Sequence, residues 1–217
     1  QTFAAALAIA AVASADPRLV NPCLNASSPF ASMPFCNAKL GIDERVKDAL
    51  GRLTIEEKIG VMITSGKPVN SLGIPAYNWW SEAAHGLSHV AEVAPTPEES
   101  NFALPITTAA AFNRTLWRET GSQIGIEARA FMNAGNAWST FWAPVINLAR
   151  DPRWGRNIET PGEDPYVVGQ YAINFVKGMQ IGKADGGEHI QASACCKHYV
   201  ANSMEATTAA GQTFTRH

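Results

Sequence analysis

The sequence RDPRWGRNIETPGEDP, residues 150–165, decides the predicted fold. Its arginines alternate with acidic residues, and its three prolines rule out a long regular helix or strand. Charges that pair in this way hold their side chains in fixed rotamers, and a fixed guanidinium presents a planar fork of donors that suits oxygen-rich ligands. We therefore interpret the stretch as a ligand site, in preference to the alternative of a salt-bridged surface loop.

The flanks of this stretch predict a loop that joins a strand to a helix. Residues 141–149 form a short apolar run of strand length. Asp164 and Pro165 are suited to the cap and the first position of a helix, and apolar residues recur at helical spacing as far as residue 181. In α/β folds, ligands bind in such loops at the carboxyl ends of the strands.

The rest of the chain alternates in the same way. We expect helices from Asp43, from a capping box at Thr54–Glu57 and from a cap at Asn113 or Thr115, the last ending at Gly135. The first of these should carry Val46, Ala49 and Leu50 on one side, and the last should bury Leu116, Ile124, Ala128 and Phe131. Strands are predicted at 73–80, 104–108 (weak), 138–149 and 191–200.

This order predicts an α/β fold with a parallel sheet, most economically a (β/α)8 barrel of the TIM type. We expect three parts: a partial signal peptide at 1–15, an extended arm at 16–42 and the barrel domain at 43–217. The last part is shorter than the roughly 250 residues of a complete barrel. The barrel is therefore expected to be only the amino-terminal portion of one.

Residues 1–15 are small and apolar and end in Ala-Ser-Ala, which is typical of a cleaved signal peptide and predicts secretion, with no membrane span. Cys23 and Cys36 are candidates for a disulfide, and Asn25 and Asn113 are candidates for glycosylation. The adjacent Cys195 and Cys196 lie in a strand-like run, so we expect buried thiols there.

Composition excludes several classes of function. The formal net charge is −2 and 46% of the residues are hydrophobic, which is typical of a globular protein with a substantial core. No basic stripe is present, so we expect no nucleic acid partner. The chain has no Cys-x-x-Cys or His-Glu-x-x-His motif, so we expect no metal, and nothing in it predicts a cofactor.

A second candidate site follows the predicted strand in GIPAYNWWSEAAHG, residues 73–86. Glu82 and His85 lie three positions apart, and no salt partner for Glu82 is obvious from the sequence. Trp79 and Trp80 are interpreted either as core residues or as a flat apolar surface for a sugar ring whose hydroxyls Glu82 would bind.

Three motifs occur in order with suitable gaps: GIPAYNWWSEAAHG, ARDPRWGRNIETPGEDP at 149–165 and ACCKHYVANSME at 194–205. Together they resemble the amino-terminal part of glycoside hydrolase family three. The WWSEAAHG form looks most like the secreted β-xylosidases of fungi and similar eukaryotes. The resemblance covers roughly residues 40–217 and implies an exo-acting enzyme that releases xylose from the non-reducing ends of xylo-oligosaccharides.

The resemblance also implies roles for individual residues. Those implied to bind the sugar at subsite −1 are Glu82, Arg156, Lys197 and His198. Glu159 would pair with one of the cations, Trp142 or Phe141 would pack on the sugar ring, and Arg216 could reach a further hydroxyl. Asp151, with Arg150 and Arg153, is expected to be scaffold, and His85 to brace its turn through a backbone hydrogen bond. The alternative for Lys197 and His198 is a strand end that points to solvent.

Family members are retaining enzymes, which need two carboxyl groups about 5 Å apart as nucleophile and acid/base. In the family both come from later in the chain, so we expect them beyond residue 217 and expect the 217 residues alone to be inactive. A β-glucosidase and a non-catalytic carbohydrate-binding protein remain alternatives. The N-acetylglucosaminidase branch is disfavoured, because Tyr199 and the residues after it lack the Gly-His-Gly expected there.

Overall fold

The computed structural model describes residues 21–88, 90, 99–182, 186–187, 189–200, 202–205, 207–209 and 212–214. The predicted signal peptide at 1–15, the first residues of the arm and Arg216 lie outside this part of the chain. The chain forms two compact units. Within the described residues, the first unit comprises 21–61 and 67–76, and the second comprises 62–66 and the residues from 77 onward.

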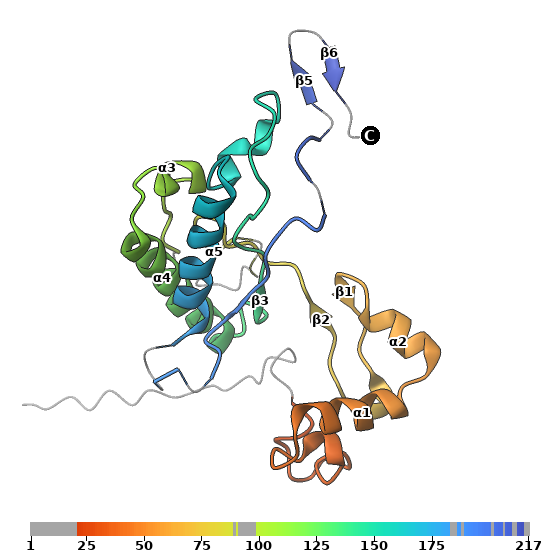
Figure 1. Cartoon of the computed structure of the whole chain (residues 1–217). Helices are drawn as coiled ribbons and strands as arrows, with labels where there is room; N and C mark the ends of the chain where they lie inside the picture. Colours follow the sequence, from red (N-terminus) through yellow and green to blue (C-terminus); the bar gives the residue numbers. More distant parts are fainter. Residues whose placement is uncertain are drawn as a thin grey trace, which may run out of the picture. The chain divides into compact units, whose positions relative to one another are not determined.

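The first unit is a small helical body (Figure 1). It contains the 3-10 helices η2 (Pro34–Cys36) and η3 (Asn70–Leu72) and the α-helices α1 (Ile42–Arg52) and α2 (Ile55–Val61). Phe35, Val69 and Leu72 form its buried centre, and a disulfide joins Cys23 to Cys36 beside it.

These units divide the chain differently from the boundary expected at residue 42. Helix α1 is hydrogen-bonded to residues of the predicted arm. Asp48 Oδ2 accepts a hydrogen bond from Phe35 N (3.1 Å), and Arg45 Nε donates one to Phe35 O (2.9 Å). On the face of α1 predicted to be apolar, Ala49 packs on the centre of the unit, whereas Val46 and Leu50 are exposed.

Local signals at the helix ends are confirmed. Thr54 and Glu57 form the predicted capping box, in which Glu57 N donates to Thr54 Oγ1 (3.2 Å) and Thr54 N donates to Glu57 Oε2 (3.0 Å). In the second unit, Asn113 Oδ1 accepts hydrogen bonds from the first turn of α4 (Arg114–Asn133). Of the two predicted candidates, Asn113 and Thr115, the cap is therefore Asn113. Asp164 caps α5 (Pro165–Gln180) as predicted.

The strands of the second unit are shorter than predicted. Strand β1 (Ser65–Gly66) pairs with β2 (Tyr77–Asn78) in an antiparallel manner, and β5 (Thr207–Ala209) pairs likewise with β6 (Gln212–Phe214). Strand β3 (Thr140–Phe141) pairs in parallel with β4 (Ser193–Ala194), and single parallel bridges join Glu82 to Trp142 and Val145 to Lys197. Segments around residues 82, 140–145 and 193–197 therefore run parallel, with α4 and α5 in the connections between them, which is an α/β arrangement.

The sequence-based predictions for residues 104–108 and for the two adjacent cysteines are wrong. The weak strand predicted at 104–108 is a helix, α3 (Pro105–Ala109), because Pro105 occupies its first turn and Thr108 Oγ1 donates to Ala103 O (2.9 Å). Cys195 and Cys196 are exposed thiols, not buried ones. Strand β4 ends at Ala194, and the next residue is held through its backbone, by the bond from Cys195 N to Phe141 O (2.8 Å).

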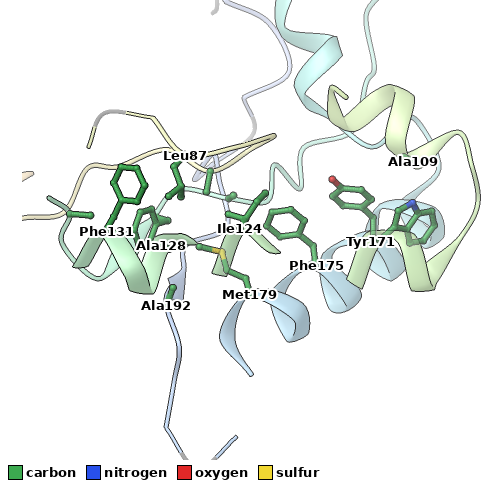
Figure 2. Close-up of a cluster of buried hydrophobic side chains, with 14 residues drawn as sticks. Leu87, Ala109, Ile124, Ala128, Phe131, Tyr171, Phe175, Met179 and Ala192 are labelled. Atoms are coloured by element: carbon green, nitrogen blue, oxygen red, sulfur yellow. The ribbon is translucent and has the colours of Figure 1, made fainter. Parts of the chain in front are cut away.

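Helices α4 and α5 lie side by side (Figure 1), and half of the residues described in the buried hydrophobic cluster of the second unit come from them. Figure 2 shows Ile124 of α4 beside Phe175 of α5 and Ala128 beside Met179, with Phe131 at one end of the same cluster. Leu116, predicted to belong to this face, is exposed. Its neighbour Trp117 is buried instead and donates Nε1–H to Thr108 O (2.9 Å).

Glycines allow the two helices to approach closely. A Cβ atom on Gly121 or Gly125 would overlap the backbone of α5, at Phe175 O and Met179 O, and one on Gly178 would overlap Arg118 O of α4. Because the obstacle in each case is backbone, a side chain could not relieve it by changing rotamer.

No helix in the described residues is long and apolar enough to cross a lipid bilayer.

This packing predicts opposite effects for the same substitution at two positions of α5. Gly178→Ala should lower the free energy of unfolding by roughly 1–3 kcal/mol, because the helices must move apart. Gly169→Ala, where no atom lies within 4 Å of the added Cβ, should raise it by up to about 1 kcal/mol through helix propensity. Urea unfolding of the purified variants measures both, and equal shifts would contradict the close approach.

Candidate functional site

A cavity of about 460 Å³ lies in the second unit, next to the carboxyl ends of the parallel segments. Its charged lining consists of Glu82, Glu99, Arg156, Glu159 and Lys197, with His85 and Asn101 also in the wall. The three motifs identified in the sequence therefore contribute side chains to one hollow. This is the arrangement predicted for a ligand site at strand ends.

Lys197 is the most deeply buried charged side chain in this wall. Its side chain is 7% exposed, and Nζ lies 2.6 Å from Glu82 Oε2 and 3.7 Å from Glu159 Oε2. The expectation that Glu82 lacks a salt partner is therefore wrong, and so is the alternative in which Lys197 points to solvent. A buried ammonium is tolerated only when it is paired in this way.

The backbone explains why residues so far apart in sequence meet. Trp142 N donates to Ser81 O (2.7 Å), which aligns Glu82 with the segment that continues β3. Lys197 N donates to Pro144 O (3.1 Å) and Ile146 N donates to Lys197 O (2.8 Å), so Lys197 is held on the other side of the same segment. Adjacent parallel strands thus place Glu82 and Lys197 at one edge.

Arg156 lies on the short 3-10 helix η4 (Gly155–Glu159), which the sequence did not predict within the charged loop. Its Nε and Nη2 atoms bind Glu159 Oε1 and Oε2 at 2.6 and 2.9 Å, a bidentate pair. Nη1 donates to Glu205 Oε1 (2.9 Å), and Nη2 also lies 2.8 Å from His198 Nε2. The guanidinium is therefore held by three side chains at once.

Hydrogen bonds and buried side chains fix the charged loop. Trp154 is 2% exposed and Thr160 is fully buried, so the loop is anchored on both sides of Arg156. Asn157 Nδ2 donates to Asp151 O (2.7 Å) and closes the first part of the loop. The orientation of Arg156 is thus set before any ligand arrives.

The charges in the site reinforce one another. The hydrogen bonds that Arg156 donates to the Glu159 carboxylate raise the pKa of Arg156 further above its ordinary value. Burial alone would raise the pKa of Glu159, but the hydrogen bonds and charge of Arg156, together with Lys197, outweigh it and lower that pKa. Burial, then the charges of Arg156 and Lys197, lowers the pKa of His198, so its imidazole is neutral at neutral pH.

Aromatic rings border the same carboxylate. Trp80 Nε1 donates to Glu82 Oε1 (3.1 Å), and the Trp80 and Trp142 rings lie 6.1 Å apart. Trp79 and Trp80 are 45% and 39% exposed, so the interpretation of these residues as core is wrong. Of the two residues proposed to pack on a sugar ring, Phe141 is fully buried in the core and only Trp142 is accessible.

Other predicted residues make no contact with Arg156 or Lys197 that the structure describes. Asp151 pairs with Arg153 (2.6 Å), whose hydrogen bonds lower the pKa of Asp151 to about 2. His85 Nδ1 lies 2.8 Å from Asn101 Oδ1, so its partner is a side chain and not the expected backbone group. Asn25 and Asn113 are exposed.

Some residues of the site were missed from the sequence. Glu205 binds Arg156, and Asn202 Nδ2 supports it by donating to Glu205 Oε1 (3.1 Å). The only signal was an acid in the same motif as Lys197, which does not reveal its partner. Within the described residues, no group of three or more His, Cys, Asp or Glu side chains could hold a metal ion. The arrangement instead offers fixed charged donors and acceptors beside an aromatic surface, which suits a ligand rich in hydroxyl groups.

Comparison with known proteins agrees with this geometry. Beta-D-xylosidase 3 of Arabidopsis thaliana is 48% identical over 81% of the chain, and Beta-xylosidase/alpha-L-arabinofuranosidase 2 of Medicago sativa subsp. varia is 43% identical over 94%. The chain spans about a quarter of the length of these relatives, 23% and 27% respectively. A solved family-three exo-β-xylosidase, in complex with a xylobiose aziridine activity-based probe, superposes with a TM-score of 0.72 at 33% identity, covering 83% of the chain and 23% of that structure.

The family model described as the glycosyl hydrolase family 3 N terminal domain matches residues 53–215, which include all three motifs and every described residue of the charged cluster. The chain belongs to glycosyl hydrolase family 3, as part of its N-terminal domain.

Proposed function

We propose that this chain supplies the sugar-binding part of a retaining, exo-acting β-xylosidase that releases xylose from the non-reducing ends of xylo-oligosaccharides. The observation that carries the proposal is the convergence of Glu82, Arg156 and Lys197 on one cavity. The relatives named as β-xylosidases support the choice of xylose.

The chemistry of the cavity fits a single terminal sugar. Glu82 accepts and Lys197 donates, so neighbouring hydroxyls of a pyranose could each exchange a charge-assisted hydrogen bond with one of them. His198 holds Arg156 through its unprotonated ring nitrogen, and Trp142, which pairs with Glu82, offers an apolar surface for the C–H face of the ring. Because these groups are held by one another, little side-chain entropy remains to be lost on binding.

The carboxylates of the cluster are poor candidates for the acid/base. A general acid needs a raised pKa, whereas Arg156 and Lys197 lower the pKa of Glu159 despite its burial, and hydrogen bonds from Asn202 and Arg156 lower the pKa of Glu205. We propose that the nucleophile and the acid/base lie in the part of the protein beyond residue 217. The relatives, of which the chain spans only about a quarter, have the length to contain them.

The finer points of the fold are proposed on the same basis. The parallel order of the segments at 82, 140–145 and 193–197 supports the start of a (β/α)8 barrel within the domain proposed at 43–217. The disulfide between Cys23 and Cys36 and the exposed positions of Asn25 and Asn113 support secretion after removal of a signal peptide, with glycans on the two asparagines.

The activity is tested with 4-nitrophenyl β-D-xyloside and β-D-glucoside. We expect the full-length protein to hydrolyse the xyloside with the higher kcat/KM and to release xylose with retained configuration. The 217 residues alone should release none. Preference for the glucoside would favour the β-glucosidase alternative, and binding of xylose without turnover would favour the non-catalytic one. Hydrolysis by the 217 residues alone would refute the proposal that the nucleophile and the acid/base lie beyond residue 217.

Substitution of Arg156 tests whether the charged cluster around it binds the sugar. Lysine cannot reach Glu159, Glu205 and His198 together, so Arg156→Lys should lower kcat/KM for the xyloside by about 10–100-fold. The matched control is Arg153→Lys, because Arg153 pairs with Asp151 on the exposed side of the same loop. We expect that control to change kcat/KM less than about twofold. Equal losses in the two variants would place the sugar elsewhere.

A further inference from the structure

His198 is contacted at both of its ring nitrogens. On one side, Nε2 lies 2.8 Å from Arg156 Nη2. On the other side, Nδ1 lies 3.4 Å from Asn147 Oδ1, and the same oxygen accepts a hydrogen bond of 2.6 Å from the backbone N–H of His198. Asn147 is 8% exposed and follows the segment that also binds Lys197 through Ile146. It is therefore a buried amide directed at the residue that presents the imidazole.

These contacts determine where the imidazole proton lies. A guanidinium has only donors, so Nε2 must accept from Arg156 and must itself carry no proton. The proton of the neutral ring is then on Nδ1, which faces Asn147 Oδ1. The oxygen of Asn147 is also fixed in position, because a backbone N–H at 2.6 Å requires an acceptor and not the amide nitrogen.

We propose that Asn147 is a positioning residue of the sugar site, which holds His198 as the neutral Nδ1–H tautomer and directs its unprotonated Nε2 towards Arg156. This inference rests on the proposed function, since it assigns to Asn147 a part in binding the same sugar. Asn147 acts through His198 and does not itself need to touch the ligand.

The charges around His198 show why the neutral form matters. Lys197 precedes it in the chain, Arg156 and Glu159 face it from η4, and Glu205 faces it from the following segment. The guanidinium lies in direct contact, so a proton on Nε2 would place an N–H group and a positive charge against Arg156. The ring would then have to turn away, and Arg156 would lose one of its three side-chain partners.

A carboxylate at position 147 would differ from the native amide in its negative charge. Asn147→Asp preserves the acceptor for both the backbone N–H and Nδ1–H, but its negative charge favours the imidazolium. The change should raise the pKa of His198 by roughly one unit or more. If the neutral ring is needed, the acid limb of the kcat/KM profile for the xyloside should move to higher pH in the same variant.

The experiment is an imidazole titration by NMR on the full-length protein with isotope-labelled histidine, with the His198 signal assigned from its absence in His198→Gln. Nitrogen shifts of the unmodified protein at neutral pH should show a protonated Nδ1 and an unprotonated Nε2. This measurement uses the unmodified protein, so it does not depend on whether Asn147→Asp folds. The matched control is Asn37→Asp, an exposed site where the side chain accepts from Lys39 N (3.0 Å), and it should leave the titration and the pH profile unchanged.

A protonated Nε2 in the neutral ring would overturn the proposal. An unmoved titration of His198 in Asn147→Asp would overturn it as well, and so would a raised pKa with no shift of the pH profile. Absence of xyloside hydrolysis by the unmodified protein at every pH would instead remove the proposed function, while the nitrogen shifts would still decide the tautomer. The two failures are therefore distinguishable.

Discussion

The ion pair between Lys197 and Glu82 is the contact on which the site depends. The two residues are 115 positions apart, their charged atoms lie 2.6 Å from each other, and the lysine side chain is almost completely removed from water. An ammonium buried to this degree strongly destabilises a protein unless a carboxylate faces it. The pair therefore requires the segments at 82, 142–145 and 197 to lie next to one another in parallel, which is the central feature of the fold.

A second layer of charges fixes this pair. Glu159 binds Arg156 in a bidentate manner and also lies 3.7 Å from Lys197 Nζ, so it links the two cations. Arg156 in turn reaches Glu205 and His198, and His198 is held by Asn147. A sugar hydroxyl that enters such a network meets donors and acceptors that are already oriented, which is how a binding site gains affinity without new contacts.

The sequence predicted those features that depend on near neighbours in the chain. Thr54 with Glu57, Asn113 and Asp164 cap helices because their side chains bind backbone groups two or three positions away. Residues 104–108 were assigned wrongly as a strand because their β-branched side chains outweighed Pro105, and because the contact of Trp117 with Thr108 O is tertiary. The strand ends and the three motifs predicted the position of the site, but the pairing of Glu82 with Lys197 and the roles of Glu205 and Asn147 depend on contacts between segments far apart in sequence.

A double-mutant cycle on Glu82 and Lys197 tests the account most directly. The free energy of unfolding of the full-length protein would be measured for the unmodified protein, Glu82→Gln, Lys197→Met and the double variant. The account predicts that the two changes are not additive, with a coupling of about 1–3 kcal/mol, because each single change leaves a buried group without its charged partner. Additivity within about 0.5 kcal/mol would show that the two side chains do not meet in the folded protein and would contradict the site.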